Sequence, residues 1–172
     1  GEYVPGGNYF RGIVKLFNLP MSNFSPGLSE QKPLEISGHS LATAICYEVV
    51  YPDLVAKKSR NASMLLTVSN DAWFGDSLAL PQHLQMAQMR ALENSKPMLR
   101  ATNNGLTAFI DHRGSLTSAL LPFKEGELTG NIKPRIGQTP FSIWGSWPCI
   151  ILCIILVYVV AQLNTSRNGI RG

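Results

Sequence analysis

The sequence predicts an α/β domain followed by a single apolar helix that spans a membrane. Between residues 34 and 132, short apolar runs of strand length alternate with two segments that have helical periodicity. Turns rich in glycine, proline and asparagine separate these runs. The last part of the chain changes character, because no charged residue occurs from Phe141 to Leu163. The 172 residues are enough for one domain with a hydrophobic core.

Residues 1–33 are rich in glycine, proline, asparagine and serine and predict a long surface loop. We expect the chain to be a piece of a longer protein, because it does not begin with methionine. Within this loop, Phe17 and Phe24 place large apolar side chains on a turn-rich backbone. Three roles remain open for them: lining a pocket, contacting a membrane or anchoring the core.

The first strands and the first helix follow in order. Leu34–Ile36 and Leu41–Cys46 predict two strands around a Ser-Gly-His turn. Residues 52–60 predict a helix, with proline in its first turn and basic side chains near its end. The nearly continuous apolar run 63–68 predicts a strand that is covered on both faces of its sheet.

A second helix and four short strands complete the predicted domain. A polar and aromatic loop, residues 69–76, leads to a helix over Pro81–Lys96, where Leu84 and Ala91 share one apolar face. Pro97 ends this helix. Short strands are predicted at residues 98–102, 105–111, 115–121 and 126–132, separated by Asn-Asn-Gly and Arg-Gly turns. The pattern favours helices packed on a sheet.

The apolar segment Ile143–Leu163 predicts a transmembrane helix. Its 21 residues would extend about 31 Å as a helix, roughly one hydrocarbon core. Trp144 and Trp147 stand at its start, where interfacial indoles are common. The alternative is a buried core helix, which the length disfavours, and the flanking charges are too evenly balanced to orient the helix. We therefore divide the chain into a domain (residues 1–140), a transmembrane helix (141–164) and a tail (165–172).

Composition excludes a nucleic-acid partner and a disulfide framework. The net charge of +4 is mild, and the one tight basic cluster, residues 57–60, has the spacing of a helix surface. Three cysteines are too few and odd in number for a disulfide framework. Cys149 and Cys153 lie one helical turn apart in the apolar segment, which predicts a packing or lipid-facing role. No cysteine or histidine spacing is typical of a metal site, and no cofactor is expected.

Cys46 is the candidate nucleophile, because it stands at the carboxyl end of a predicted strand and shortly before a helix. Ligands bind at this edge of α/β sheets, and nearby amides favour the thiolate that attacks carbonyl groups. The alternative is a plain core cysteine. The histidines at positions 39, 83 and 112 are expected on the surface or in loops, so the thiol would need a carboxylate base and a cation for the oxyanion.

Several motifs resemble the nitrilase, or carbon–nitrogen hydrolase, superfamily. They are Ile-Cys-Tyr-Glu at residues 45–48, Leu-Thr-Val-Ser-Asn-Asp-Ala-Trp-Phe-Gly at 66–75, and the segments 82–94 and 100–105. Three further features narrow the resemblance to one family within this superfamily. They are the opening Gly-Glu-Tyr-Val-Pro, the Phe-Asn-Leu-Pro-Met-Ser segment at 17–22 and the terminal apolar helix. Together they are similar to the carboxyl-terminal part of the bacterial apolipoprotein N-acyltransferase family.

The resemblance implies a nitrilase-like αββα sandwich, present here in part, on the periplasmic side of the bacterial inner membrane. Enzymes of that family take an acyl chain from a membrane phospholipid onto a cysteine as a thioester. They then pass it to the α-amino group of the diacylglyceryl-cysteine of an apolipoprotein. Phospholipid, apolipoprotein and membrane are therefore the expected partners, and residues 165–172 would be cytoplasmic.

The resemblance also implies roles for individual residues. Cys46 matches the nucleophile, Tyr47 supplies an amide for the oxyanion and shapes the site with Glu48, and Glu2 matches a supporting acid. Contacts with acyl chains or a lid role are expected for four aromatic side chains, with core packing as the alternative: Trp73, Phe74, Phe17 and Phe24.

The chain departs from the family pattern in one respect. The family's catalytic glutamate and lysine lie upstream of the Gly-Glu-Tyr-Val-Pro segment, so we expect this chain to be inactive on its own. Two alternatives remain: a nitrilase-type amidase that hydrolyses a small amide, and an inactive membrane-anchored remnant.

Overall fold

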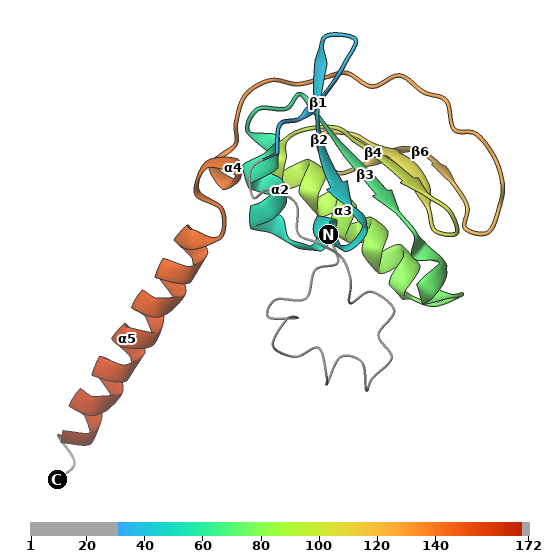
Figure 1. Ribbon diagram of the computed structural model, residues 1–172. Helices are drawn as coiled ribbons and strands as arrows, with labels where there is room; N and C mark the ends of the chain where they lie inside the picture. Colours follow the sequence, from blue (N-terminus) through green and yellow to red (C-terminus); the bar gives the residue numbers. More distant parts are fainter. Residues whose placement is uncertain (1–30, 170–172) are drawn as a thin grey trace, which may run out of the picture.

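A six-stranded mixed sheet forms the centre of the molecule (Figure 1). The computed structural model describes residues 31–169, with side chains through Leu163. The strands lie in the order of the sequence: β1 (Leu34–Ile36), β2 (His39–Ile45), β3 (Met64–Ser69), β4 (Met98–Thr102), β5 (Thr107–Ile110) and β6 (Leu116–Leu120). β2, β3 and β4 are parallel to one another, whereas β1, β5 and β6 pair antiparallel with their neighbours.

Two helical crossovers make the three central strands parallel, as parallel strands require. After β2, the short 3-10 helix η1 (Cys46–Val50) and the helix α2 (Pro52–Ser59) lead to β3. After β3, the 3-10 helix η2 (Asp71–Phe74) and α3 (Ala79–Asn94) lead to β4. The helices α2 and α3 contact each other and the same face of the sheet. The carboxyl ends of β2, β3 and β4 therefore share one edge, from which η1 and η2 begin.

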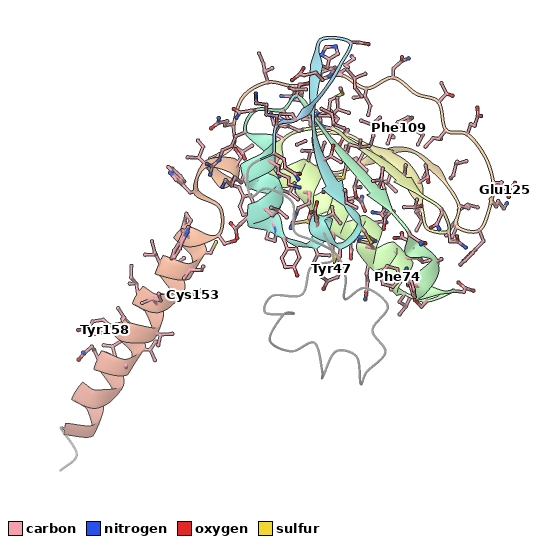
Figure 2. The ribbon with its side chains drawn as sticks, in the orientation of Figure 1. Tyr47, Phe74, Phe109, Glu125, Cys153 and Tyr158 are labelled. Carbon is pink, nitrogen blue, oxygen red and sulfur yellow. The ribbon has the colours of Figure 1, made fainter. Side chains whose placement is uncertain are left out.

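The apolar segment near the carboxyl terminus forms two helices, α4 (Pro140–Trp144) and α5 (Trp147–Gly169). Between them Gly145 has a φ of +59°, which ends α4 and turns the chain. The prediction of one continuous helix from residue 143 was therefore wrong at its start. α5 extends away from the sheet, and Figure 2 shows Cys153 and Tyr158 projecting from it into open space.

Within the part of the chain that the structure describes, no helix combines the length and the apolar character that a membrane crossing requires. The predicted transmembrane helix is therefore not confirmed.

Helix α2 holds the start of α5 through two side chains. The Arg60 guanidinium donates to the carbonyl oxygens of Ser142 (2.7 Å) and Ile143 (3.0 Å). The Asp53 carboxylate accepts hydrogen bonds from the backbone amide (2.8 Å) and the hydroxyl (2.9 Å) of Ser146, just before α5. Arg60 is exposed, as expected for a residue of the 57–60 cluster, and also forms these specific contacts.

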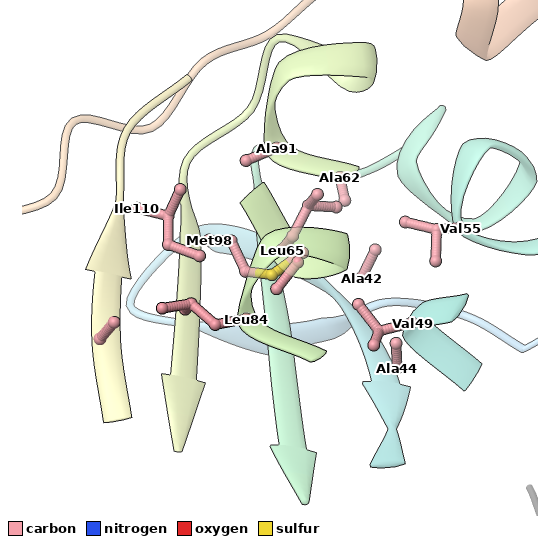
Figure 3. Close-up of a cluster of buried hydrophobic side chains, with 12 residues drawn as sticks. Ala42, Ala44, Val49, Val55, Ala62, Leu65, Leu84, Ala91, Met98 and Ile110 are labelled. Carbon is pink, nitrogen blue, oxygen red and sulfur yellow. The ribbon is translucent and has the colours of Figure 1, made fainter. Parts of the chain in front are cut away.

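The core lies between the sheet and the helices α2 and α3 (Figure 3). Alternate residues of each strand point toward the helices, as the period of a strand requires. The buried cluster comprises Ala42, Ala44, Val49, Val55, Ala62, Leu65, Leu84, Ala87, Ala91, Met98, Ala108 and Ile110. Small residues on α3 and β2 let the helix approach the sheet closely.

The opposite face of the sheet is only partly covered. On β3, Leu65 and Thr67 are buried on the helix side, while Leu66 is half-buried and Val68 is 39% exposed on the other side. The prediction of a strand covered on both faces is therefore not met by the described residues.

Most predicted elements are present, with one exception. Residues 126–132 form no strand, although an extended strand was expected there. The segment is largely exposed, and Gly130 lies so close to the Phe109 ring that a Cβ would overlap it. The segment thus touches side chains of both β5 and β6, since Gly126 lies near Leu120, but it pairs with neither strand.

Candidate active site

The register of the parallel strands brings three loop starts together at one edge of the sheet. Ile45 of β2 pairs with Val68 of β3, and Ser69 of β3 pairs with Thr102 of β4. Cys46 therefore follows β2 directly beside the end of β3. This is the edge at which α/β sheets bind ligands.

Cys46 occupies a sharp turn between β2 and η1. Its φ of +51° lies in the left-handed region, which is unfavourable for a residue with a Cβ. The turn presents the thiol at the end of the strand, and Cys46 is half-buried and not walled into the core. In a 3-10 helix the amides of the first residues have no intrahelical acceptor, which leaves the Tyr47 amide available to a ligand.

Glu48 braces this turn. Its Oε2 accepts hydrogen bonds from the Ile45 amide (2.9 Å) and from the Lys58 ammonium (3.0 Å). Lys58 also donates to the carbonyl oxygen of Thr43 at 3.1 Å, so it ties α2 to both β2 and η1. Burial raises the pKa of Glu48, but the hydrogen bonds and the charge of Lys58 outweigh it, and the pKa lies below its usual range. Glu48 is thus held as a carboxylate.

Ser69 connects the thiol to a buried carboxylate. Its hydroxyl lies 3.3 Å from Cys46 Sγ and 2.5 Å from Asp71 Oδ1. Asp71 has no exposed surface. Burial raises the pKa of Asp71, but the hydrogen bonds from His83 and Ser69 and the charge of Arg100 lower it, and the net shift is downward. A charged carboxylate therefore lies one hydroxyl away from the sulfur.

Asp71 belongs to a fully buried ionic cluster with Arg100 and His83. Arg100 Nη2 donates to Asp71 Oδ2 at 2.7 Å, and its Nε donates to the carbonyl oxygen of Leu106 at 3.1 Å. His83 Nδ1 lies 3.1 Å from both Asp71 Oδ1 and Arg100 Nη2. The cluster unites β4, α3 and η2, so three elements fix the carboxylate.

His83 corrects one prediction. It was expected on the surface or in a loop, but it lies on α3 with 4% of its surface exposed. Its position one residue before the buried Leu84, and four before the buried Ala87, was the signal that could have placed it on the inner face of α3. Ser69, Asp71 and Arg100 lie within the recognised motifs, but the sequence did not mark them as neighbours of Cys46.

Two asparagines join the loops after β3 and β4. Asn103 Oδ1 accepts hydrogen bonds from the backbone amides of Asp71 (3.0 Å) and Asn104 (2.8 Å), and its Nδ2 donates to Asn70 Oδ1 (2.6 Å). Gly105 then approaches the Asp71 carboxylate so closely that a Cβ would overlap it. The two loops therefore hold Asp71 in position from the solvent side.

The aromatic candidates separate into exposed and packed side chains. Tyr47 is 52% exposed and meets Tyr51 edge to face, with ring centroids 5.7 Å apart. Trp73 is 63% exposed. Phe74 is half-buried and packs edge to face on His83 at 5.8 Å, so it braces the buried cluster. In Figure 2, Tyr47 and Phe74 lie at the same end of the sheet.

Three other predicted residues, Glu2, Phe17 and Phe24, lie outside the described residues. Among the described residues, no group of three or more histidine, cysteine, aspartate and glutamate side chains is arranged to hold a metal ion. The site consists of a half-buried thiol at the sheet edge, an amide without an intrahelical partner and a buried charged cluster. This arrangement fits nucleophilic attack by a thiolate on a carbonyl carbon.

Known proteins have sequences related to this chain. An apolipoprotein N-acyltransferase of Pseudomonas syringae pv. tomato is 50% identical over 156 residues, which are 91% of this chain and 31% of that protein. One of Photobacterium profundum is 49% identical over 170 residues, which are 98% of this chain and 33% of that protein. The chain thus spans about a third of the length of these curated relatives.

The fold also resembles a solved structure. The crystal structure of Saccharomyces cerevisiae Nit3, a member of branch 10 of the nitrilase superfamily, superposes with a TM-score of 0.50 at 19% identity, over 59% of this chain and 40% of that chain. This likeness concerns the fold alone. A model of the carbon-nitrogen hydrolase family matches residues 9–141. Because that match covers most of the sequence, the chain belongs to the carbon–nitrogen hydrolase family.

Proposed function

We propose that this chain carries the nucleophile of an apolipoprotein N-acyltransferase. The observation that carries the proposal is Cys46, whose left-handed turn presents a thiol beside the free Tyr47 amide at the carboxyl edge of the sheet. The names of the relatives, which are 49–50% identical, support acyl transfer as the reaction. The donor would be a membrane phospholipid and the acceptor the α-amino group of a diacylglyceryl-cysteine.

The reaction proceeds in two steps at one sulfur. The Cys46 thiolate attacks an ester carbonyl of the phospholipid, a C–S bond forms, and the C–O bond breaks to release the lysophospholipid, which takes up a proton. The amine of the apolipoprotein then attacks the thioester, so a C–N bond forms, the C–S bond breaks and the amine loses a proton. In both tetrahedral states the negative oxygen accepts a hydrogen bond from the Tyr47 amide.

The chain would act as the carboxyl-terminal third of a longer polypeptide. The family resemblance places the general base and the oxyanion lysine upstream of the matched segments, and Glu2 is proposed as a supporting acid. On its own the chain would therefore hold the nucleophile without its base and remain inactive. The half-open outer face of the sheet supports the same view, because in an αββα sandwich a second sheet covers it.

We also propose that α5 contacts lipid as a membrane helix. From Ile150 to Ala161 the helix carries only apolar and aromatic side chains, and all of them are exposed. A helix that is apolar all round requires an apolar environment. Trp144 and Trp147, 60% and 68% exposed, would lie at the interface, with the site on the periplasmic side.

The exposed aromatic rim is proposed to receive acyl chains. Trp73, Tyr47 and Tyr51 are each more than half exposed near the thiol edge, where an acyl donor would approach. Phe74 is better assigned to packing, because it contacts His83.

A hybrid protein tests the proposed reaction. In the Photobacterium profundum relative, the third that matches this chain is replaced by residues 1–172. We expect the hybrid to convert a diacylated lipopeptide with a free amine to a triacylated product in phospholipid micelles, as measured by mass spectrometry, and the chain alone to give none. Hydrolysis of small amides without acyl transfer would instead support an amidase. Activity in neither assay, with the parent relative active, would favour an inactive remnant.

A further inference from the structure

The Ser69 hydroxyl joins the reacting sulfur to charges that lie entirely within the core. We propose that Ser69 is a positioning residue for the Cys46 thiol, held in place by the buried cluster of Asp71, Arg100 and His83. The proposal rests on the proposed function in one respect, namely that Cys46 is the nucleophile. It adds a device that orients the sulfur before and after it loses its proton.

The two contacts of Ser69 cannot both be donated by its single proton. The shorter contact, 2.5 Å to Asp71 Oδ1, identifies the carboxylate as the acceptor. The hydroxyl oxygen then has a lone pair for the S–H of Cys46, 3.3 Å away. When the sulfur is negative, rotation of the hydroxyl directs the same proton to the thiolate, while Asp71 retains the hydrogen bond from Arg100. Ser69 therefore serves both protonation states of Cys46.

The cluster behind Ser69 is fixed on all sides. Arg100 is 2% exposed and bonds both Asp71 and the carbonyl oxygen of Leu106. Burial lowers the pKa of Arg100, and the charge and hydrogen bond of Asp71 oppose this shift only in part. Because the Asp71 carboxylate is held rigidly, a Ser69 hydroxyl that donates to it stays in contact with the Cys46 sulfur.

Two buried nitrogens of the cluster mark it as more than a packing element. Among the described residues, His83 Nε2 and Arg100 Nη1 are buried without a hydrogen-bond partner. Unsatisfied buried groups of this kind carry an energetic cost and are few in native proteins. A purely structural core at this position would be more stable if it were apolar. The retained charges are explained if they position Ser69 and the sulfur.

Two substitutions of Ser69 in the hybrid test the proposal. Ser69→Ala removes the hydroxyl, Ser69→Thr keeps it, and Ser115→Ala is the control, because Ser115 is exposed at the opposite end of the sheet. The rate of Cys46 thioester formation in a single turnover is measured against phospholipid concentration. We expect Ser69→Ala to lower the maximal rate about 10- to 100-fold, the effect of one hydrogen bond to a charged group. The half-saturating concentration should not change.

Ser69→Thr should stay within about threefold of the unchanged hybrid, as one retained hydrogen bond predicts, and Ser115→Ala should match it. An unchanged maximal rate in Ser69→Ala would overturn the proposal, and so would an equal loss in Ser69→Ala and Ser69→Thr, which would point to packing. A circular dichroism melt confirms that each variant is folded. An acyl adduct that persists in Cys46→Ser would refute the proposed function itself.

Discussion

At Cys46 the backbone adopts a conformation that glycine accepts and other residues resist. A left-handed φ costs a residue with a Cβ about 1–2 kcal/mol, and neighbouring contacts must offset that cost. Here the hydrogen bonds of Glu48 to Ile45 and Lys58 hold both sides of the turn. Functional residues are commonly found in such conformations, because the turn exposes a side chain that a straight strand would bury.

This strain predicts an unusual order of stability for two substitutions. Cys46→Gly should be more stable than Cys46→Ala by about 1 kcal/mol, because glycine adopts a φ of this kind freely. At most positions the order is the reverse. Urea unfolding of the two variants in mild detergent measures the difference, with Ala44→Gly, inside β2, as the control that should be destabilised. Equal stability, or a more stable alanine, would show that the turn at residue 46 is unstrained.

The charge of Asp71 makes the stability of the domain depend on pH. Its pKa in the folded state is lowered, so the carboxylate stabilises the fold at pH values above the unfolded pKa of about 3.9, and this contribution is lost as the pH falls through the lower folded value. The Asp71→Asn variant should lose about 3–5 kcal/mol at pH 7, as expected when one partner of a buried ion pair is removed.

The measurement is denaturant unfolding between pH 7 and pH 2. The unchanged chain should lose stability below about pH 4, and Asp71→Asn should show a shallower decline. Asp76→Asn, at an exposed aspartate in the same loop, serves as the control. Parallel pH curves for the unchanged chain and Asp71→Asn would argue against a charged Asp71 in the folded state.

At the scale of elements, local sequence patterns predicted the helices and strands that depend on residues close together along the chain. The strands β1 to β6 and both long helices follow from apolar periodicity and from turns at glycine and proline. The segment 126–132 has the same local pattern but forms no strand, and its Gly130 lies against the Phe109 ring. The break at Gly145 was missed as well, since Asp53 and Arg60 that hold it lie more than eighty residues earlier.

The candidate site was likewise predictable where it depends on local sequence and unpredictable where it depends on packing. The position of Cys46 at the end of a strand could be predicted, because strand, turn and helix are adjacent in sequence. The contacts of Ser69 and Asp71 with His83 and Arg100 could not, because they depend on how three separate elements pack. Motif recognition identified the segments but not which side chains meet.

Arg60, at the end of α2, is predicted to stabilise the junction between α4 and α5. Arg60→Ala removes both hydrogen bonds to the end of α4, so the junction at residues 139–146 should open more often. We expect hydrogen exchange of this segment to become about tenfold faster, as the loss of roughly 1.4 kcal/mol of local stability implies. The core strands should be unaffected.

Arg113→Ala is the matched control, because Arg113 is exposed in the turn between β5 and β6. Equal exchange at residues 139–146 in all three proteins would contradict the role given to Arg60.

For the whole molecule, we propose that the chain provides the nucleophile and one side of the site around it. It spans about a third of its curated relatives, and the outer face of its sheet is half open. The proposed base, the second sheet and most membrane contacts would come from elsewhere in a longer polypeptide. In the proposed function, lipids would reach the thiol edge from the side, past the exposed aromatic rim and α5.

The most direct test of the account is covalent labelling of Cys46 in the hybrid. The protein is incubated with phospholipid that carries an isotope-labelled acyl chain, without acceptor, and the peptide containing residue 46 is analysed by mass spectrometry. The account predicts a labelled acyl group on Cys46 that hydroxylamine removes, as it removes thioesters, and none in Cys46→Ser. A labelled acyl group on any other residue, or one that survives in Cys46→Ser, would contradict it.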